Sequence, residues 1–448
     1  MNLPFFQRGV GIFAIALLAY LVGAGCLVGL AWDGSGYFFN SLQMGEPVIS
    51  HHRYSNYFTL WSVVQAGRWV EDSWTLGVFY SALLALTPLI SLALSLWFLR
   101  GPQLAPLRIW PVLGILPGAL PGEICLMSEA SLTVQAFWPI LAFVAAGVPA
   151  GGLFWVGGLS LYLFFLHPTS ALLFFLAAML AGALAWEQSA IRAKAFTWSA
   201  LWLVLALARL GFSLQTATPY ERGELGWEAN WQAFLGSLFG LPLGLLGCLY
   251  LFGLAYLAGS TGGLVPARSR RIALGAALAF MVIGLVWAAD STLWAGAIGY
   301  RRFIFLSALP LIVMGGFHRF WLRRAGSELS WSGVFPPSTV AGVAAGFALI
   351  FMVQSLTWRA DVIRFQTALT QAPGPWVTRA ELPWMKGRAL DHWSSSMLSA
   401  IVQGRSPRAI YAENWAHVKG DDLELFPGGW LLSTDAWFRL APESRSRP

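Results

Sequence analysis

The feature that most constrains this chain is a succession of long apolar segments that fills most of its length. By residue type, about eleven of them reach or approach the roughly 20 apolar residues that a membrane-spanning helix needs. They lie at 10–31, 75–99, 104–122, 131–148, 151–166, 169–186, 196–213, 233–257, 273–289, 303–317 and 338–356. Because lipid offers no hydrogen-bond partners to a backbone, such segments span a bilayer as helices. The sequence therefore predicts an all-α polytopic membrane protein with about 11 transmembrane helices.

Composition agrees with this class. Hydrophobic residues make up 57% of the 448 residues and charged residues only 11%, whereas a soluble domain carries about 25% charged residues. The 24 tryptophans suit rings that lie at the level of the lipid headgroups. The three cysteines all fall within apolar segments and predict neither a disulfide framework nor a metal site.

The distribution of charge predicts an orientation. With the N-terminus inside, the inner connections carry basic residues, namely Arg100, Arg108, Arg192, Lys194, Arg268, Arg270, Arg271, Arg319, Arg323 and Arg324. The outer connections carry acids, namely Asp33, Glu46, Glu71, Asp72, Glu129, Glu221, Glu224, Glu228 and Asp290. Basic residues kept on the cytoplasmic side indicate an N-in, C-out topology, and the net charge of +7 then suggests no nucleic-acid partner. If 131–148 and 151–166 formed one helix, every later element would change sides of the membrane. Arg268, Arg270, Arg271 and the cluster at 318–324 would then lie outside, so the charge rule favours two separate helices.

Two hydrophilic pieces fall on the predicted outer face. The first outer loop, 33–74, has apolar residues at three- and four-residue spacings within 37–42 and 57–64, which predicts amphipathic helices lying in the membrane interface. The other piece is the tail. We expect a transmembrane domain over 1–357 and a small extracytoplasmic domain, α+β or irregular, over 358–448.

Asp33 is the first candidate for chemistry, because it follows the first apolar segment within a few residues. A carboxylate at the boundary between water and lipid can accept a proton from a hydroxyl group or hold a divalent cation. The alternative is a helix-end acid in water that caps the next helix through the Asp-Gly-Ser-Gly turn.

Further along the loop come His51, His52 and Arg53. Two histidines and a guanidinium beside an interfacial helix can bind a phosphate group. The alternative is that the histidines are polar packing residues with satisfied hydrogen bonds.

An acid just after the first predicted span, with Tyr37 four residues on and an amphipathic outer loop, resembles the GT-C superfamily of integral-membrane glycosyltransferases. About eleven spans and a C-terminal extracytoplasmic domain fit the same pattern. The resemblance implies a polyprenyl-phosphate-sugar donor and a role for Asp33 as general base or metal ligand. One departure is that many of these enzymes carry adjacent acids in this loop, whereas Asp33 is followed by Gly34 and the paired acids Glu71–Asp72 come at its end.

The resemblance extends to two other predicted outer positions. Glu129 lies in the second outer loop, where members of the superfamily often have another acid that helps to bind metal or acceptor. The alternative is an acid stabilised by the dipole of the following helix. His167 precedes Pro168 in the third outer turn and resembles donor-phosphate contacts in related transferases, but a plain turn histidine explains it as well.

Arg301 and Arg302 lie on the predicted outer side, against the charge rule for membrane loops. A lipid phosphate is a good reason for a basic pair in that place. Binding of an anionic headgroup without catalysis is the alternative.

The sequence thus predicts a membrane glycosyltransferase that moves a sugar, with inversion, from a polyprenyl-phosphate carrier to a hydroxyl of a glycan, lipid or protein. It would act on the outer face of a bacterial cytoplasmic (inner) membrane, with Asp33 and Glu129 as catalytic residues or ligands of Mg²⁺ or Mn²⁺. No nucleotide-binding motif is present in the sequence, which favours a lipid-linked donor. A transporter or flippase and a polysaccharide polymerase or ligase are the alternatives.

Overall fold

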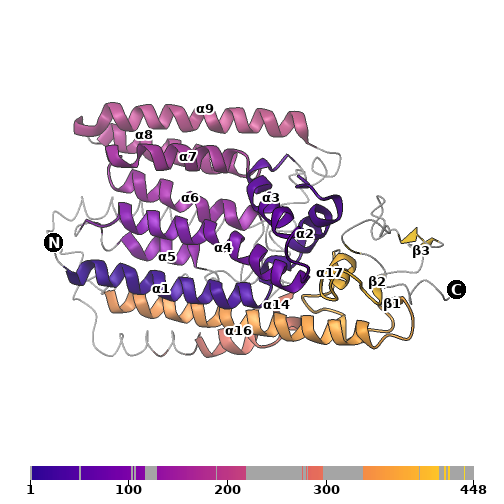
Figure 1. Cartoon of the computed structure of the whole chain (residues 1–448). Coiled ribbons are helices and arrows are strands. Elements are labelled where there is room, and N and C mark those ends of the chain that lie inside the picture. Colours follow the sequence, from indigo (N-terminus) through magenta and orange to yellow (C-terminus); the bar gives the residue numbers. More distant parts are fainter. Residues whose placement is uncertain are drawn as a thin grey trace.

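Helices make up most of the described chain, and the long ones run side by side along one direction (Figure 1). The computed structural model describes residues 3–49, 52–101, 104, 107–116, 129–187, 189–217, 275, 279, 281–295, 337–392, 394–412, 418–419, 422–423 and 438. The α-helices are α1 (Leu3–Gly25), α2 (Asp33–Met44), α3 (Tyr57–Ala66), α4 (Ser73–Phe98), α5 (Ile109–Ile115), α6 (Glu129–Ala145), α7 (Leu153–Phe164), α8 (Ser170–Glu187), α9 (Arg192–Thr216), α14 (Ser291–Ala295), α16 (Pro337–Thr370) and α17 (Ser395–Ile401). Short 3-10 turns are η1 (Val28–Leu30), η2 (Tyr54–Asn56), η4 (Ala150–Gly152), η5 (Ser189–Ile191) and η8 (Pro383–Met385).

Three of these helices are long and apolar enough to cross a membrane, at Ser73–Phe98, Ser189–Thr216 and Ala344–Thr370. Shorter apolar helices lie at Gly9–Gly25, Ser131–Ala145, Ala150–Phe164 and Ser170–Trp186. The prediction of a mainly helical chain is therefore confirmed. The number of spans and their sidedness stay predictions, and the predicted segments 233–257 and 303–317 lie outside the described residues.

The segments 131–148 and 151–166 form two helices rather than one. Gly147 and Val148 both have positive φ, 81° and 58°, and this turn reverses the chain between α6 and α7. The end of α7 lies near the start of α6, as two contacts of the first loop show. The Ser55 backbone nitrogen donates to the Phe165 carbonyl, just after α7, at 3.4 Å, and Arg53 contacts Glu129, the first residue of α6. The fused alternative is therefore wrong in the described structure.

α1 packs closely against α4 and α16. A side chain added at Gly23 would lie 2.8 Å from the Phe351 ring of α16, so the glycine lets the two helices approach each other. The Tyr20 hydroxyl donates to the Ile115 carbonyl of α5 at 2.9 Å. One core cluster of buried apolar residues continues from these helices into α2, α17 and the tail.

The predicted first outer loop folds into α2 and α3, as the spacing of apolar residues predicts. α3 is two-sided, with Leu60 buried and Phe58 exposed by 76%. α2 differs from the expectation of an interfacial helix, because Phe38 and Phe39 are fully buried. The tail covers α2, and the rings of Phe39 and Phe438 stack with their centroids 4.7 Å apart.

The tail contains short strands in addition to helix. β1 (Trp376–Thr378) pairs in parallel with β2 (Ile410–Ala412), and β3 (Val418–Lys419) pairs antiparallel with β4 (Asp422–Leu423). α16 runs unbroken past the predicted domain boundary between residues 357 and 358. A continuous helix therefore joins the bundle to the tail.

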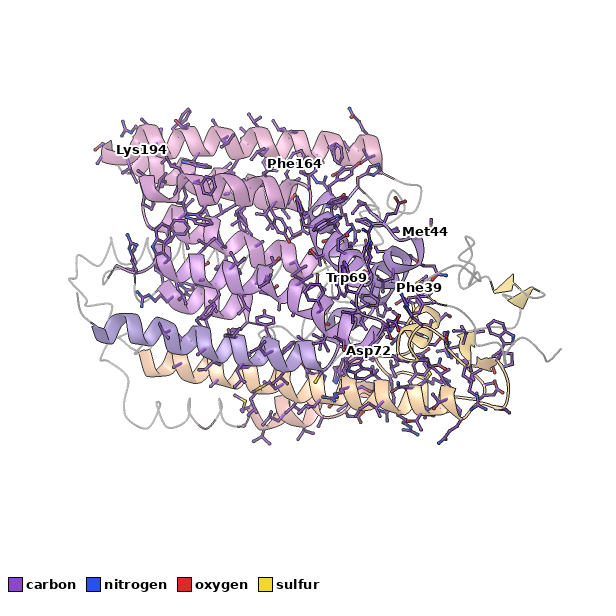
Figure 2. The ribbon with its side chains drawn as sticks, viewed as in Figure 1. Phe39, Met44, Trp69, Asp72, Phe164 and Lys194 are labelled. Carbon is purple, nitrogen blue, oxygen red and sulfur yellow. The ribbon has the colours of Figure 1, made fainter. Side chains whose placement is uncertain are left out.

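Both hydrophilic pieces lie at one end of the bundle. Figure 1 shows α2, α3, α17, β1 and β2 together there, far from the start of α1. In Figure 2 the predicted inner residue Lys194 lies at one end, whereas Met44, Trp69 and the predicted outer residue Asp72 lie at the other. This arrangement brings the acids of the first and second predicted outer loops close together.

Candidate functional site

A small pocket lies where the first loop meets the ends of α4 and α6. Its walls are Asp33, Gly34, Tyr37, Asn56, Tyr80, Leu84, Glu129 and Leu132. The cavity measures about 10 Å³, close to the roughly 10–15 Å³ that one water molecule needs, so it has room for one small polar group such as a hydroxyl.

Asp33 reaches the pocket because it is the first residue of α2. The residue before it, Trp32, has φ 55° and ψ −124°, an unusual backbone conformation for a residue with a side chain. Gly34 follows, and a Cβ at this position would lie 1.7 Å from the Gly29 carbonyl oxygen. The contact explains why a second acid does not follow Asp33, since this position has no space for any side chain.

Two side chains of the first loop hold Glu129. Arg53 donates from Nη1 to Oε2 of Glu129 at 2.8 Å, and Asn56 donates from Nδ2 to Oε1 at 2.9 Å. Glu129 is 4% exposed. Charge-assisted hydrogen bonds of this kind are about twice as strong as neutral ones, so the pair fixes η2 and α3 against the start of α6.

Tyr37 connects this ion pair with Asp33, one helical turn away on α2. Its hydroxyl accepts a hydrogen bond from Nη1 of Arg53 at 3.3 Å. Burial raises the pKa of Tyr37 well above its usual value, and the negative charge of Glu129 raises that pKa further. The phenol therefore stays neutral at physiological pH and can donate a hydrogen bond within the pocket.

The pocket fits a divalent cation poorly. Both oxygens of Glu129 already accept hydrogen bonds from Arg53 and Asn56, and a guanidinium repels a second cation. Among the described residues there is no group of three His, Cys, Asp or Glu side chains that could hold a metal ion. The metal therefore stays a prediction from sequence, and the chemistry proposed below does not use it.

The structure describes three of the six predicted phosphate-binding residues, namely His52, Arg53 and His167. Arg53 lies at the pocket but pairs with Glu129. His52 has φ 57° and packs edge-on against the Tyr54 and Phe212 rings, with centroids 6.2 and 6.1 Å away. Three predicted residues lie outside the described chain, namely His51, Arg301 and Arg302.

His167 lies in the turn that begins α8. Its Nδ1 is 2.9 Å from Thr169 Oγ1 and accepts a hydrogen bond from the Thr169 backbone nitrogen at 3.4 Å. These contacts are those of a turn histidine, which was the alternative reading of the sequence. A role of His167 toward a donor phosphate stays a prediction.

Sequence reasoning did not single out Asn56 or Tyr80, although both line the pocket. Tyr80 lies inside an apolar segment, where a tyrosine is usually a packing residue. Asn56 is two residues before Phe58 in the loop. The one feature that could have pointed to it is a polar amide beside a run of apolar and aromatic residues.

No protein-family model, curated protein or solved structure that was compared with the chain matches it. The class of protein is therefore described from the chain's own sequence and structure. It is a mainly helical protein with three described helices long and apolar enough to cross a membrane, and two carboxylates line one pocket at the end of its bundle.

Proposed function

We propose that the protein is a membrane glycosyltransferase that moves a sugar from a polyprenyl-phosphate carrier to a hydroxyl acceptor on the outer face of the cytoplasmic membrane. The observation that carries the proposal is the position of Asp33. This carboxylate lies on the wall of a small polar pocket at the end of a bundle of apolar helices. A lipid-linked donor presents its reacting carbon at that level of a membrane.

The proposed reaction is a single displacement. The acceptor oxygen attacks the anomeric carbon, while the bond from that carbon to the phosphate oxygen breaks. Polyprenyl phosphate leaves with the electron pair, and the hydroxyl proton passes to the Asp33 carboxylate as general base. Inversion at the anomeric carbon follows from one attack on the face opposite the leaving group.

The other pocket residues have positioning roles in this proposal. The Tyr37 phenol holds the acceptor hydroxyl beside Asp33, because both side chains line the same small space, and Glu129 fixes Arg53 and Asn56 around that space. Positioning of this kind lowers the barrier by holding the reactants in a reactive geometry. Arg301 and Arg302 remain our proposed ligands of the donor phosphate, on sequence grounds alone.

A transporter or flippase is the main competing function. Transporters usually place their ionisable groups near the membrane midplane, between broken helices. The walls of the pocket come instead from residues of α2, η2, α4 and α6, and Figure 1 shows α2 and the neighbouring α3 at one end of the bundle. This position favours surface chemistry over passage through the bundle.

The test uses the full-length protein in liposomes with a radiolabelled polyprenyl-phosphate sugar and a panel of lipid, glycan and protein acceptors. We expect label to move from the carrier to one acceptor fraction. Label that crosses the bilayer while still attached to its carrier would contradict the proposal and support a flippase.

A further inference from the structure

The connection between α1 and α2 has an unusual backbone at two places. Leu27 has φ 63° and Trp32 has φ 55°, and neither is a glycine. Residues with bulky side chains adopt positive φ only where their surroundings hold them there. Since Trp32 directly precedes Asp33, the contacts that hold Trp32 also set where the carboxylate lies.

Those contacts come from the far end of the sequence. Trp358 of α16 donates from Nε1 to the Leu27 carbonyl at 3.3 Å, and Ser394 donates from Oγ to the Trp32 carbonyl at 2.5 Å. Each of the two positive-φ residues is thus held through its carbonyl by a side chain more than 300 residues away, with separations of 331 and 362.

Ring contacts reinforce the same junction. The His392 ring packs against Trp32 at a centroid distance of 5.5 Å and an interplanar angle of 37°, and against Trp358 at 6.4 Å and 25°. Trp358 and Ser394 are fully buried. The tail therefore contacts Trp32, the residue before Asp33, at both its ring and its carbonyl.

The Ser394 hydroxyl bonds to residues outside its own helix. Ser394 is the N-cap residue of α17, but its side chain makes no capping hydrogen bond to that helix. Capping is the usual function of a serine in this position. Its hydroxyl instead bonds to Trp32 and lies 2.6 Å from the Ser35 hydroxyl, and Ser35 also donates to the Trp32 carbonyl at 3.0 Å.

We propose that the tail residues His392 and Ser394 position the Asp33 carboxylate, with Ser394 as the positioning residue that the experiment below tests. The inference rests on the proposed function, and it gives the tail a role in the same site. Without the Ser394 hydroxyl, the Trp32 backbone can relax and α2 can begin in a different place. A small misplacement of a catalytic group can reduce the rate about 100-fold, so we expect kcat to fall while binding of the acceptor remains.

The experiment compares full-length wild type with Ser394→Ala, Ser394→Thr and Ser399→Ala. Ser399 is the matched control, because it is equally buried and its hydroxyl bonds to Ser396 and Tyr411 within the tail. Two quantities are measured on each variant: hydrogen exchange of the backbone amides of 33–36, and kcat and KM for sugar transfer.

In Ser394→Ala we expect exchange at 33–36 to become at least about 10-fold faster and kcat to fall about 10- to 100-fold, with the acceptor KM within about twofold of wild type. Ser394→Thr should restore both, and Ser399→Ala should change neither. If Ser394→Ala does not accumulate in membranes, Ser35→Ala removes the other hydroxyl on the Trp32 carbonyl and is measured in the same way.

Exchange at 33–36 that stays at the wild-type rate in Ser394→Ala would overturn the inference, and so would faster exchange with an unchanged kcat. Exchange is measured on the protein itself and does not need substrate. If wild type transferred no sugar while Ser394→Ala exchanged faster at 33–36, the proposed function would fail and the contact between the tail and Asp33 would stand.

Discussion

At the scale of single residues, the pocket depends on one buried ion pair. The side chains of Arg53 and Glu129 are 15% and 5% exposed. Removal of one partner leaves the other charge buried without compensation, which typically costs about 3–5 kcal/mol. The Arg405–Glu71 pair, at 40% and 82% exposure, is of the kind that contributes less than about 1 kcal/mol.

We therefore expect Glu129→Ala to lower the free energy of unfolding by about 3–5 kcal/mol, and Glu71→Ala to lower it by less than about 1 kcal/mol. The measurement is reversible unfolding in mixed micelles. Equal effects of the two substitutions on the free energy of unfolding would contradict the larger contribution that we assign to the buried Arg53–Glu129 pair.

Gly34 gives a second prediction at this scale. A methyl group there would lie 1.7 Å from the Gly29 carbonyl oxygen, whereas one at Gly25 would meet nothing within 4 Å. Overpacking costs about 1–3 kcal/mol, sometimes more, so Gly34→Ala should cost about 3 kcal/mol and displace Asp33. Gly25→Ala is the control and should lie near wild type. A Gly34→Ala protein with wild-type stability and transfer rate would contradict the packing described for η1 and α2.

At the scale of elements, the start of α4 is capped by an acid. Asp72 accepts hydrogen bonds at Oδ2 from the Thr75 backbone nitrogen at 2.9 Å and from Thr75 Oγ1 at 2.6 Å. The bond from the Thr75 side chain is the main cause that holds the pKa of Asp72 below its ordinary value of 3.8. The stabilisation is therefore complete above pH 3.8 and is lost as the pH falls through the lowered pKa.

Asp72→Ala should cost about 0.5–2 kcal/mol at neutral pH, and its Tm should approach that of wild type as the pH falls below about 3.8. Asp72→Asn keeps an acceptor without a titrating group, so it should lie near wild type at neutral pH. The measurement is Tm in detergent from pH 7 down to pH 3. A difference between wild type and Asp72→Ala that persists or grows at the acid end would refute this role of the carboxylate.

The elements themselves could largely be predicted, because apolar runs and their spacings depend on local sequence. The two helices of the first loop follow from such patterns, whereas the break between α6 and α7 is predicted by the distribution of charge over the later loops. The burial of α2 could not be predicted, since it depends on Phe438, Ser394 and other tail residues that reach it only in the fold. The two central elements of the tail, β1 and β2, are each only three residues long, too short for an alternating pattern to be recognised.

At the scale of the whole molecule, the site combines predictable residues with unpredictable contacts. Asp33, Arg53 and Glu129 could each be picked out by residue type beside an apolar segment. That Arg53 would pair with Glu129, 76 residues away, rather than with a phosphate, depends on how the first loop folds back over α6. The hydrogen bond from Ser394 to Trp32 joins residues 362 positions apart in the sequence, and no local pattern indicates it.

The predicted orientation of the bundle can be tested with single cysteines in a background that lacks Cys26, Cys125 and Cys248. Glu46 and Lys194 are both exposed and lie in the predicted outer and inner connections. We expect Glu46→Cys to react with a membrane-impermeant maleimide on intact cells, and Lys194→Cys to react only after permeabilisation. The reverse pattern would place the pocket on the cytoplasmic side, where a lipid-linked donor facing outward could not reach it.

The most direct test concerns the carboxylate at the start of α2. Asp33→Asn keeps the shape of the side chain and removes its ability to accept a proton, and Glu46→Gln makes the same change at an exposed acid of the same loop. Because a general base typically contributes about 100- to 10,000-fold to a rate, Asp33→Asn should lose at least about 100-fold of sugar transfer from a labelled polyprenyl-phosphate donor, with unchanged membrane insertion. Glu46→Gln should retain the wild-type rate. Transfer by Asp33→Asn at the rate of Glu46→Gln would contradict the account.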